Sequence, residues 1–136
     1  MPSFAGQING GQILLNVVVG PPGERPSSPV VALVDTGANI SGVTPGLVER
    51  LALENTGEWI SLGGVHGSQD VATYQVALGL PIADGPGEPA FIRGDVSLAV
   101  AELELPESSQ FEVVLGMDFL KPFHLTVYRE LFILSN

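Results

Sequence analysis

The 136-residue sequence contains no cysteine, only five basic residues and no long apolar run. Without cysteine the chain has neither a disulfide framework nor a thiolate nucleophile or metal site, so cysteine usage leaves the cellular compartment open. The scattered basic residues and fifteen acids give a formal net charge of −10, which argues against nucleic acid and anionic membranes as partners. No stretch has the length of a membrane span, and the first residues do not resemble a signal peptide. We therefore expect a soluble protein, with the cytoplasm favoured as its location.

The length and the distribution of turn residues indicate the fold class. A chain of this size fits one domain, residues 1–136, and is large enough to bury a core. Short apolar runs rich in strand-forming residues alternate with clusters of glycine, proline and asparagine, whereas helical periodicity is scarce. This pattern favours an all-β barrel or sandwich.

Local signals place several of the expected elements. Asn9-Gly10-Gly11 predicts a hairpin turn, because its residues tolerate positive φ. Thr44 followed by Pro45 is typical of a helix N-cap and first position, so residues 44–53 are expected to hold a short helix or turn. The remaining expected segments are loops over 20–29 and 81–89, strands over 30–34, 91–105 and 111–115, one helical turn over 116–121, and a terminal hairpin over 123–134.

The most informative segment is Val31-Ala32-Leu33-Val34-Asp35-Thr36-Gly37-Ala38. Four apolar residues end abruptly in an acid, a hydroxyl and a glycine. A carboxylate in that position is costly to desolvate unless it has hydrogen-bond donors, a shared proton or a substrate. Thr36 and Gly37 offer the donors. The segment therefore predicts an active-site loop at the end of a buried strand.

A second apolar-apolar-Gly motif follows far downstream, at Val113-Val114-Leu115-Gly116-Met117-Asp118. Together, the two motifs resemble those of the retropepsin-like aspartic proteases, and the resemblance covers residues 13–134. It implies an all-β, single-domain retropepsin-like acid-protease barrel with one short helix near the C-terminus, forming half of a two-fold dimeric enzyme. It also implies a structural role for Gly116 and Asp118.

The number of Asp-Thr-Gly motifs predicts a homodimer. Hydrolysis by this chemistry requires two carboxyl groups that share one proton. The chain has a single Asp-Thr-Gly, so we expect one Asp35 from each of two copies at a two-fold axis. In this hypothesis Asp35 is the general acid and base, Thr36 joins the two loops, Gly37 permits a close approach, and Ala38 keeps the site open.

A glycine-rich hairpin tip between the two motifs predicts a flap over the substrate, an extended peptide. The expected flap and peptide-binding residues are Leu62, Gly63, Gly64, Val65, His66 and Gly67. Further candidates for substrate pockets are Asn39, Ile40 and Val43. For Ile40 and Val43, as for Leu62 and Val65, a place in the core is an equally good interpretation.

Two departures from the retroviral pattern favour a cellular or bacterial branch of the family. Retroviral members typically carry Asp where Asn39 stands and Arg where Met117 stands, and those two residues pair by charge. No metal site is expected, because His66 and His124 lack a third ligand at useful spacing, and the family implies no cofactor.

Two alternatives to an endopeptidase remain open at this stage. The chain could be a binding or dimerisation module that retained the fold without turnover. It could also be a domain that processes only its own precursor.

Overall fold

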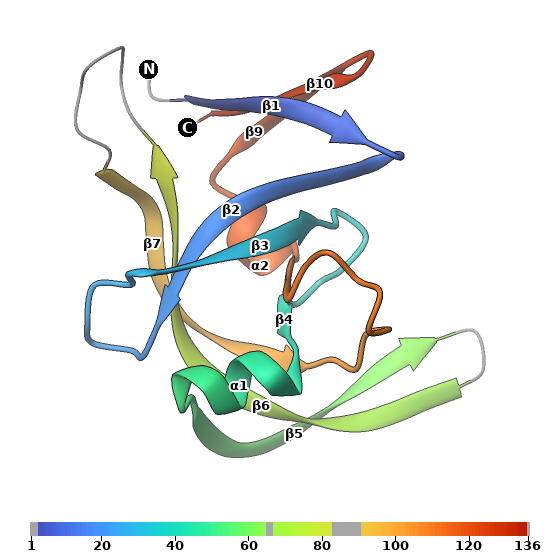
Figure 1. Ribbon diagram of the computed structural model, residues 1–136. Helices are drawn as coiled ribbons and strands as arrows, with labels where there is room; N and C mark the ends of the chain where they lie inside the picture. Colours follow the sequence, from blue (N-terminus) through green and yellow to red (C-terminus); the bar gives the residue numbers. More distant parts are fainter. Residues whose placement is uncertain (1–2, 65–66, 83–90, 136) are drawn as a thin grey trace.

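The computed structural model describes residues 3–64, 67–82 and 91–135, which form strands and two short helices (Figure 1). The expected all-β class is confirmed, and α2 is the short helix expected near the C-terminus. Neither helix within these ranges is long and apolar enough to cross a membrane. The elements are β1 (Ser3–Asn9), β2 (Gln12–Gly20), β3 (Ser28–Val34), β4 (Gly42–Val43), α1 (Pro45–Leu51), β5 (Glu54–Gly64), β6 (Gly67–Ile82), β7 (Phe91–Glu102), β8 (Val113–Leu115), α2 (Met117–Leu120), β9 (His124–Tyr128) and β10 (Leu131–Ser135).

Six of the strands close into a barrel. β6, β7, β4, β8, β3 and β2 are neighbours in this order, and a further pairing of β2 with β6 joins the two ends. β3 pairs with β8 in parallel, and so does β4 with β7. These strands contribute apolar side chains to one buried cluster, among them Val17, Val19, Ala32, Val76, Leu78, Val100, Val113 and Leu115. The core of the protein therefore lies among the barrel strands.

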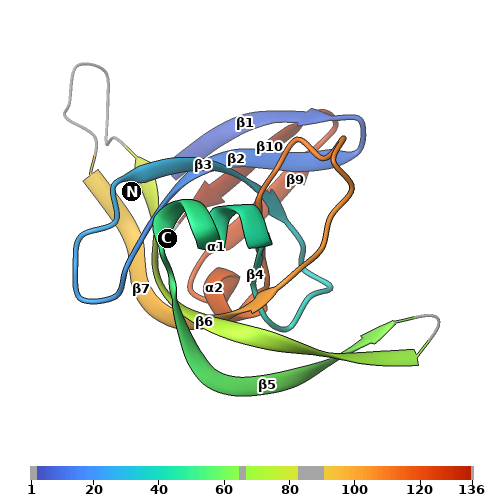
Figure 2. The same ribbon diagram turned by 60° about the horizontal axis from the view of Figure 1, so that its bottom comes forward.

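Two groups of strands extend from the barrel. β5 and the first part of β6 form a long hairpin that projects from the body, at the lower right of Figure 2. On the other side, β10 lies between β1 and β9, and Ser3 pairs with Ser135 (Figure 1). The two ends of the described chain therefore lie side by side.

Both predicted turns contain residues with positive φ. Gly10 and Gly11, at φ 58° and 77°, join β1 to β2. Arg129, at φ 55°, and Glu130 join β9 to β10 in the expected terminal hairpin.

Helix α1 begins as its capping signal predicts. The Thr44 hydroxyl accepts a hydrogen bond from the Leu47 N–H at 3.3 Å, and Pro45 occupies the first turn. The helix ends at Leu51, two residues before the predicted end, because Ala52 adopts a left-handed conformation at φ 50°. Leu47 is fully buried and anchors the helix to the barrel.

The boundaries of β6 and β7 differ from those expected. Pro81 and Ile82, predicted as loop, continue β6 and pair with β7, which is compatible with a proline near the end of a strand. β7 ends at Glu102 instead of continuing to residue 105, because its last residues pair with the two-residue strand β4. The remainder of the predicted loop, residues 83–89, lies outside the described residues.

Arg50 and Glu112 join the end of α1 to the segment before β8. The guanidinium donates two hydrogen bonds of 2.8 Å, and these bonds lower the pKa of the Glu112 carboxyl. A carboxyl with a lowered folded-state pKa stabilises the fold above its unfolded pKa, and this contribution is lost as the pH falls through the folded pKa.

We therefore expect Glu112→Gln to destabilise the protein at neutral pH, by less than about 1 kcal/mol because both side chains are substantially exposed. In urea unfolding, the difference in free energy of unfolding between this variant and the wild type should shrink as the pH is lowered from about 7 to about 3. A difference that stays constant over this range would show that the ion pair is not its cause.

Candidate active site

The Asp35 side chain stands in the turn that follows β3. The Asp35 N–H donates to the Leu115 carbonyl at 2.9 Å, and the Asp35 carbonyl accepts from the Ala38 N–H at 3.2 Å. The Gly37 N–H donates to Asp35 Oδ1 at 3.0 Å, so Gly37 supplies one of the two donors expected from the sequence. Asp35 is partly buried, and Thr36 is exposed beside it. The carboxylate is thus oriented by the backbone of its own turn.

The second motif runs directly beside this turn. β3 and β8 pair in parallel up to its glycine, and the next residue, Met117, donates its N–H to the Ala38 carbonyl at 2.8 Å. A Cβ at Gly116 would lie 2.8 Å from the carbonyl carbon and oxygen of Ile40 and 2.9 Å from the carbonyl oxygen of Ala38. These are backbone atoms, which cannot turn aside as a side chain can. The two segments are therefore close enough to require glycine.

Hydrogen bonds between the buried Ser41 and the second motif hold the two segments in contact. The Asp118 carboxylate accepts hydrogen bonds from the Ser41 N–H at 2.9 and 3.0 Å and from the Ser41 hydroxyl at 2.6 Å. The Ser41 hydroxyl in turn accepts from the Gly116 N–H at 2.9 Å. Ser41 has a relative exposure of 0%, so each of its polar groups needs such a partner. No local signal distinguishes Ser41 in the sequence, because its partner lies 77 residues away.

The Asp35 turn opens into a cavity of about 760 Å³ between the barrel and the β5–β6 hairpin. We call it the Asp35 cavity. The cavity brings together seven residues singled out from the sequence, namely Asp35, Gly37, Ala38, Asn39, Ile40, Leu62 and Gly63. Asp35 is the only acidic residue among the described residues that line it, and the rest of the lining is largely apolar.

Other predicted site residues lie elsewhere. Val43 is a correction to the pocket prediction, since its exposure is 1% and it belongs to the core. Two-residue strand β4 pairs with β7 and β8 on either side and turns this side chain inward. Gly64 ends β5 and Gly67 begins β6, on the two arms of the expected flap. Val65 and His66, at its tip, lie outside the described residues.

Sequence reasoning missed part of the apolar lining. Leu33 and Val114 come from the paired strands β3 and β8, and Ile60 comes from β5. Three more side chains come from the segment after β7, namely Leu103, Leu105 and Phe111. The alternation of apolar and polar residues in a sequence shows only that such residues belong to a strand. Which face of the sheet borders a cavity depends on how distant strands pair.

The fold and the geometry around Asp35 define a class of protein. A closed β-barrel in which an Asp-Thr-Gly turn lies beside an apolar-Gly segment is the retropepsin-like architecture, corresponding to one half of a dimeric aspartic protease. Comparison with protein families matches residues 19–119 to a family described as aspartyl protease. The chain belongs to this aspartyl protease family.

Two solved structures are similar to this chain. The crystal structure of a retropepsin-like aspartic protease from Rickettsia conorii shares the fold, with a TM-score of 0.59 at 18% identity, over 97% of this chain and 89% of that one. The EIAV protease complexed with the inhibitor HBY-793 matches with a TM-score of 0.48 at 21% identity, over 82% of this chain and 86% of that one. Comparison with curated proteins gives no significant match.

Proposed function

We propose that the protein is an aspartic endopeptidase that hydrolyses peptide bonds through a pair of carboxyl groups, one Asp35 from each subunit of a homodimer. The observation that carries this proposal is the Asp35 turn, which opens into a largely apolar cavity and is locked against the Gly116 segment. One carboxyl takes a proton from the attacking water while the other protonates the carbonyl oxygen of the substrate. No cofactor is required for these steps.

The homodimer follows from the number of carboxyl groups. Asp35 is the only acid among the described residues that line its cavity, whereas the reaction needs two acids that share a proton. A second copy of the chain, related by a two-fold axis, supplies the missing group. Thr36, exposed beside Asp35, is then available to hydrogen-bond across the axis.

The substrate in this proposal is an extended peptide held between the Asp35 turn and the β5–β6 hairpin, which acts as the flap. Leu62 and Gly63 bring the hairpin into the lining of the Asp35 cavity. An extended peptide in this cavity would form main-chain hydrogen bonds with the hairpin, while alternate side chains would contact the apolar walls. This geometry favours cleavage inside a peptide over removal of a terminal residue.

We expect peptide hydrolysis per subunit to fall as the protein is diluted below the dissociation constant of the dimer, because a lone subunit holds one carboxyl. Sedimentation and a quenched-fluorescence peptide assay over the same concentrations should give coincident curves. Full specific activity at concentrations where only monomer sediments would contradict the shared site. A stable dimer that cleaves no peptide in a diverse library, from acidic to neutral pH, would favour a non-catalytic module.

A further inference from the structure

A second cavity lies where β6 and β7 diverge. β6 and β7 pair from Ile82 and Phe91 as far as Thr73 and Ala101. The part of β6 that precedes Thr73 pairs with β5 in the projecting hairpin, whereas the end of β7 pairs with β4. Within the described residues, no strand pairs with the second edge of β6 between Gly67 and Ala72. A space of about 710 Å³ lies between this edge, Trp59 and the chain at the end of β7, residues 102–104. We call it the Trp59 cavity.

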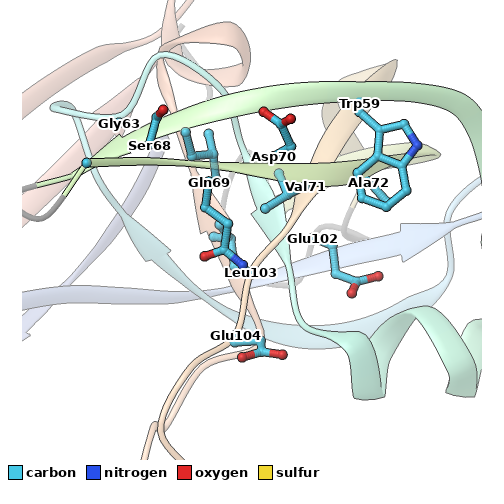
Figure 3. A pocket seen from close by; sticks show the side chains of 12 residues that line it. Trp59, Gly63, Ser68, Gln69, Asp70, Val71, Ala72, Glu102, Leu103 and Glu104 are labelled. Carbon is cyan, nitrogen blue, oxygen red and sulfur yellow. The ribbon is translucent and has the colours of Figure 1, made fainter.

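The lining of the Trp59 cavity combines an exposed aromatic ring with carboxylates. Trp59 is 67% exposed, although an indole is costly to leave in water. Trp59, Glu102 and Glu104 all line the cavity. In Figure 3 Glu102 lies between Trp59 and Glu104, and Glu104 lies farther along the segment that follows β7. Glu102 is held in place by the Tyr74 hydroxyl, which donates to it at 2.8 Å. Asp70 also lines the cavity and accepts a 2.5 Å hydrogen bond from the Ser61 hydroxyl. No basic residue is among the described residues that line it.

The Trp59 cavity adjoins the Asp35 cavity. Leu62, Gly63 and Leu103 line both spaces. A peptide that lies across Asp35 therefore needs no separate entrance to reach Trp59, since its chain only has to continue past these three residues.

We propose that the Trp59 cavity is a subsite for the same peptide, where a Lys or Arg side chain some residues away from the cleaved bond is bound. The peptide main chain would run along the open edge of β6, since an unpaired strand edge offers N–H and C=O groups to an extended chain. The cationic side chain would lie on the Trp59 ring, with Glu102 and Glu104 nearby. This inference rests on the proposed endopeptidase function and adds a preference to it.

The chemistry of the lining favours a cation over the other classes of side chain. An acidic side chain would meet three carboxylates without a counter-charge. An apolar side chain would fit the ring and Leu103 but would leave the carboxylates unused. A guanidinium or ammonium group is attracted by both features, because the face of an indole is the best aromatic partner for a cation.

The first experiment compares peptides that differ at a single position. Quenched peptides carrying Lys are paired with peptides carrying its neutral isostere norleucine, and the position is moved stepwise away from the cleaved bond. We expect one position at which Lys raises kcat/KM about tenfold, an advantage that salt weakens. Trp59→Leu and Glu104→Gln should each reduce this advantage, whereas Glu24→Gln, an equal change of charge in the β2–β3 loop, should leave it intact. Equal cleavage of every pair would overturn the subsite while leaving the endopeptidase in place.

The second experiment separates binding from hydrolysis. Trp59 is the only tryptophan of the chain, so its fluorescence reports directly on this cavity. In an Asp35→Asn protein, the preferred Lys peptide should change the fluorescence and bind about tenfold more tightly than its norleucine counterpart. If no peptide is cleaved by the wild type, the Lys and norleucine series is titrated directly, and this binding result would support the subsite although the proposed catalysis had failed. Unchanged fluorescence, or equal affinity for both series, would overturn the subsite.

Discussion

Asp35→Asn is expected to abolish peptide hydrolysis while the protein keeps its fold and its dimer. The amide has the shape of the carboxyl but can neither take a proton from water nor share one with its twin, so the single site of the proposed homodimer loses both its general acid and its general base. General acid–base groups of this kind contribute about 10²- to 10⁴-fold, and we expect a loss at the upper end of this range because the substitution appears twice per dimer. The measurement is kcat/KM on the best peptide substrate, at protein concentrations well above the dissociation constant of the dimer.

Retention of structure is part of the same prediction. The Gly37 N–H can donate to the side-chain amide oxygen of the introduced asparagine as it does to Asp35 Oδ1, so circular dichroism and sedimentation should match those of wild type. Glu24→Gln removes one negative charge in the β2–β3 loop and serves as the matched control, with activity expected to remain. An Asp35→Asn protein that still cleaves at the wild-type rate would place the chemistry elsewhere.

The parts of the site that could be predicted from the sequence depend on contiguous residues. Asp35, Thr36 and Gly37 follow one another, and a carboxylate after an apolar strand is unusual enough to be noticed. Gly116 could be recognised because three apolar residues precede it within the same short motif. In both cases one stretch of chain holds the whole signal. The hairpin turn at Gly10 and the cap at Thr44 were predictable for the same reason.

The parts that could not be predicted depend on the pairing of distant strands. Val43 and Ile40 are equally apolar and close in sequence, yet one is buried in the core and the other lines the Asp35 cavity, because β4 is fixed between β7 and β8. Ser41 gains its importance from Asp118, and Trp59 from the point at which β6 and β7 separate. These relations are set by register and closure of the barrel, which a single sequence does not display.

Gly116→Ala is expected to destabilise the protein by about 3 kcal/mol or more. The added methyl group would lie within 2.9 Å of three backbone atoms of Ala38 and Ile40, so relief requires the Asp35 turn or the start of α2 to move. Either movement strains the hydrogen bonds that join the two motifs, including the bond from the Gly116 N–H to the Ser41 hydroxyl. Because the same turn carries Asp35, the folded fraction should also show reduced kcat, with the loss exceeding what instability alone explains.

Gly46→Ala provides the matched control for this substitution. Gly46 lies in the first turn of α1, where a Cβ would meet nothing within 4 Å, so alanine should leave stability unchanged or raise it by up to about 1 kcal/mol. Urea unfolding of the two variants under one set of conditions separates a general intolerance of alanine from the specific contact at Gly116. Equal stability of the two would mean that the segments beside Asp35 have room to part, and the close approach would then not be what fixes the Asp35 turn.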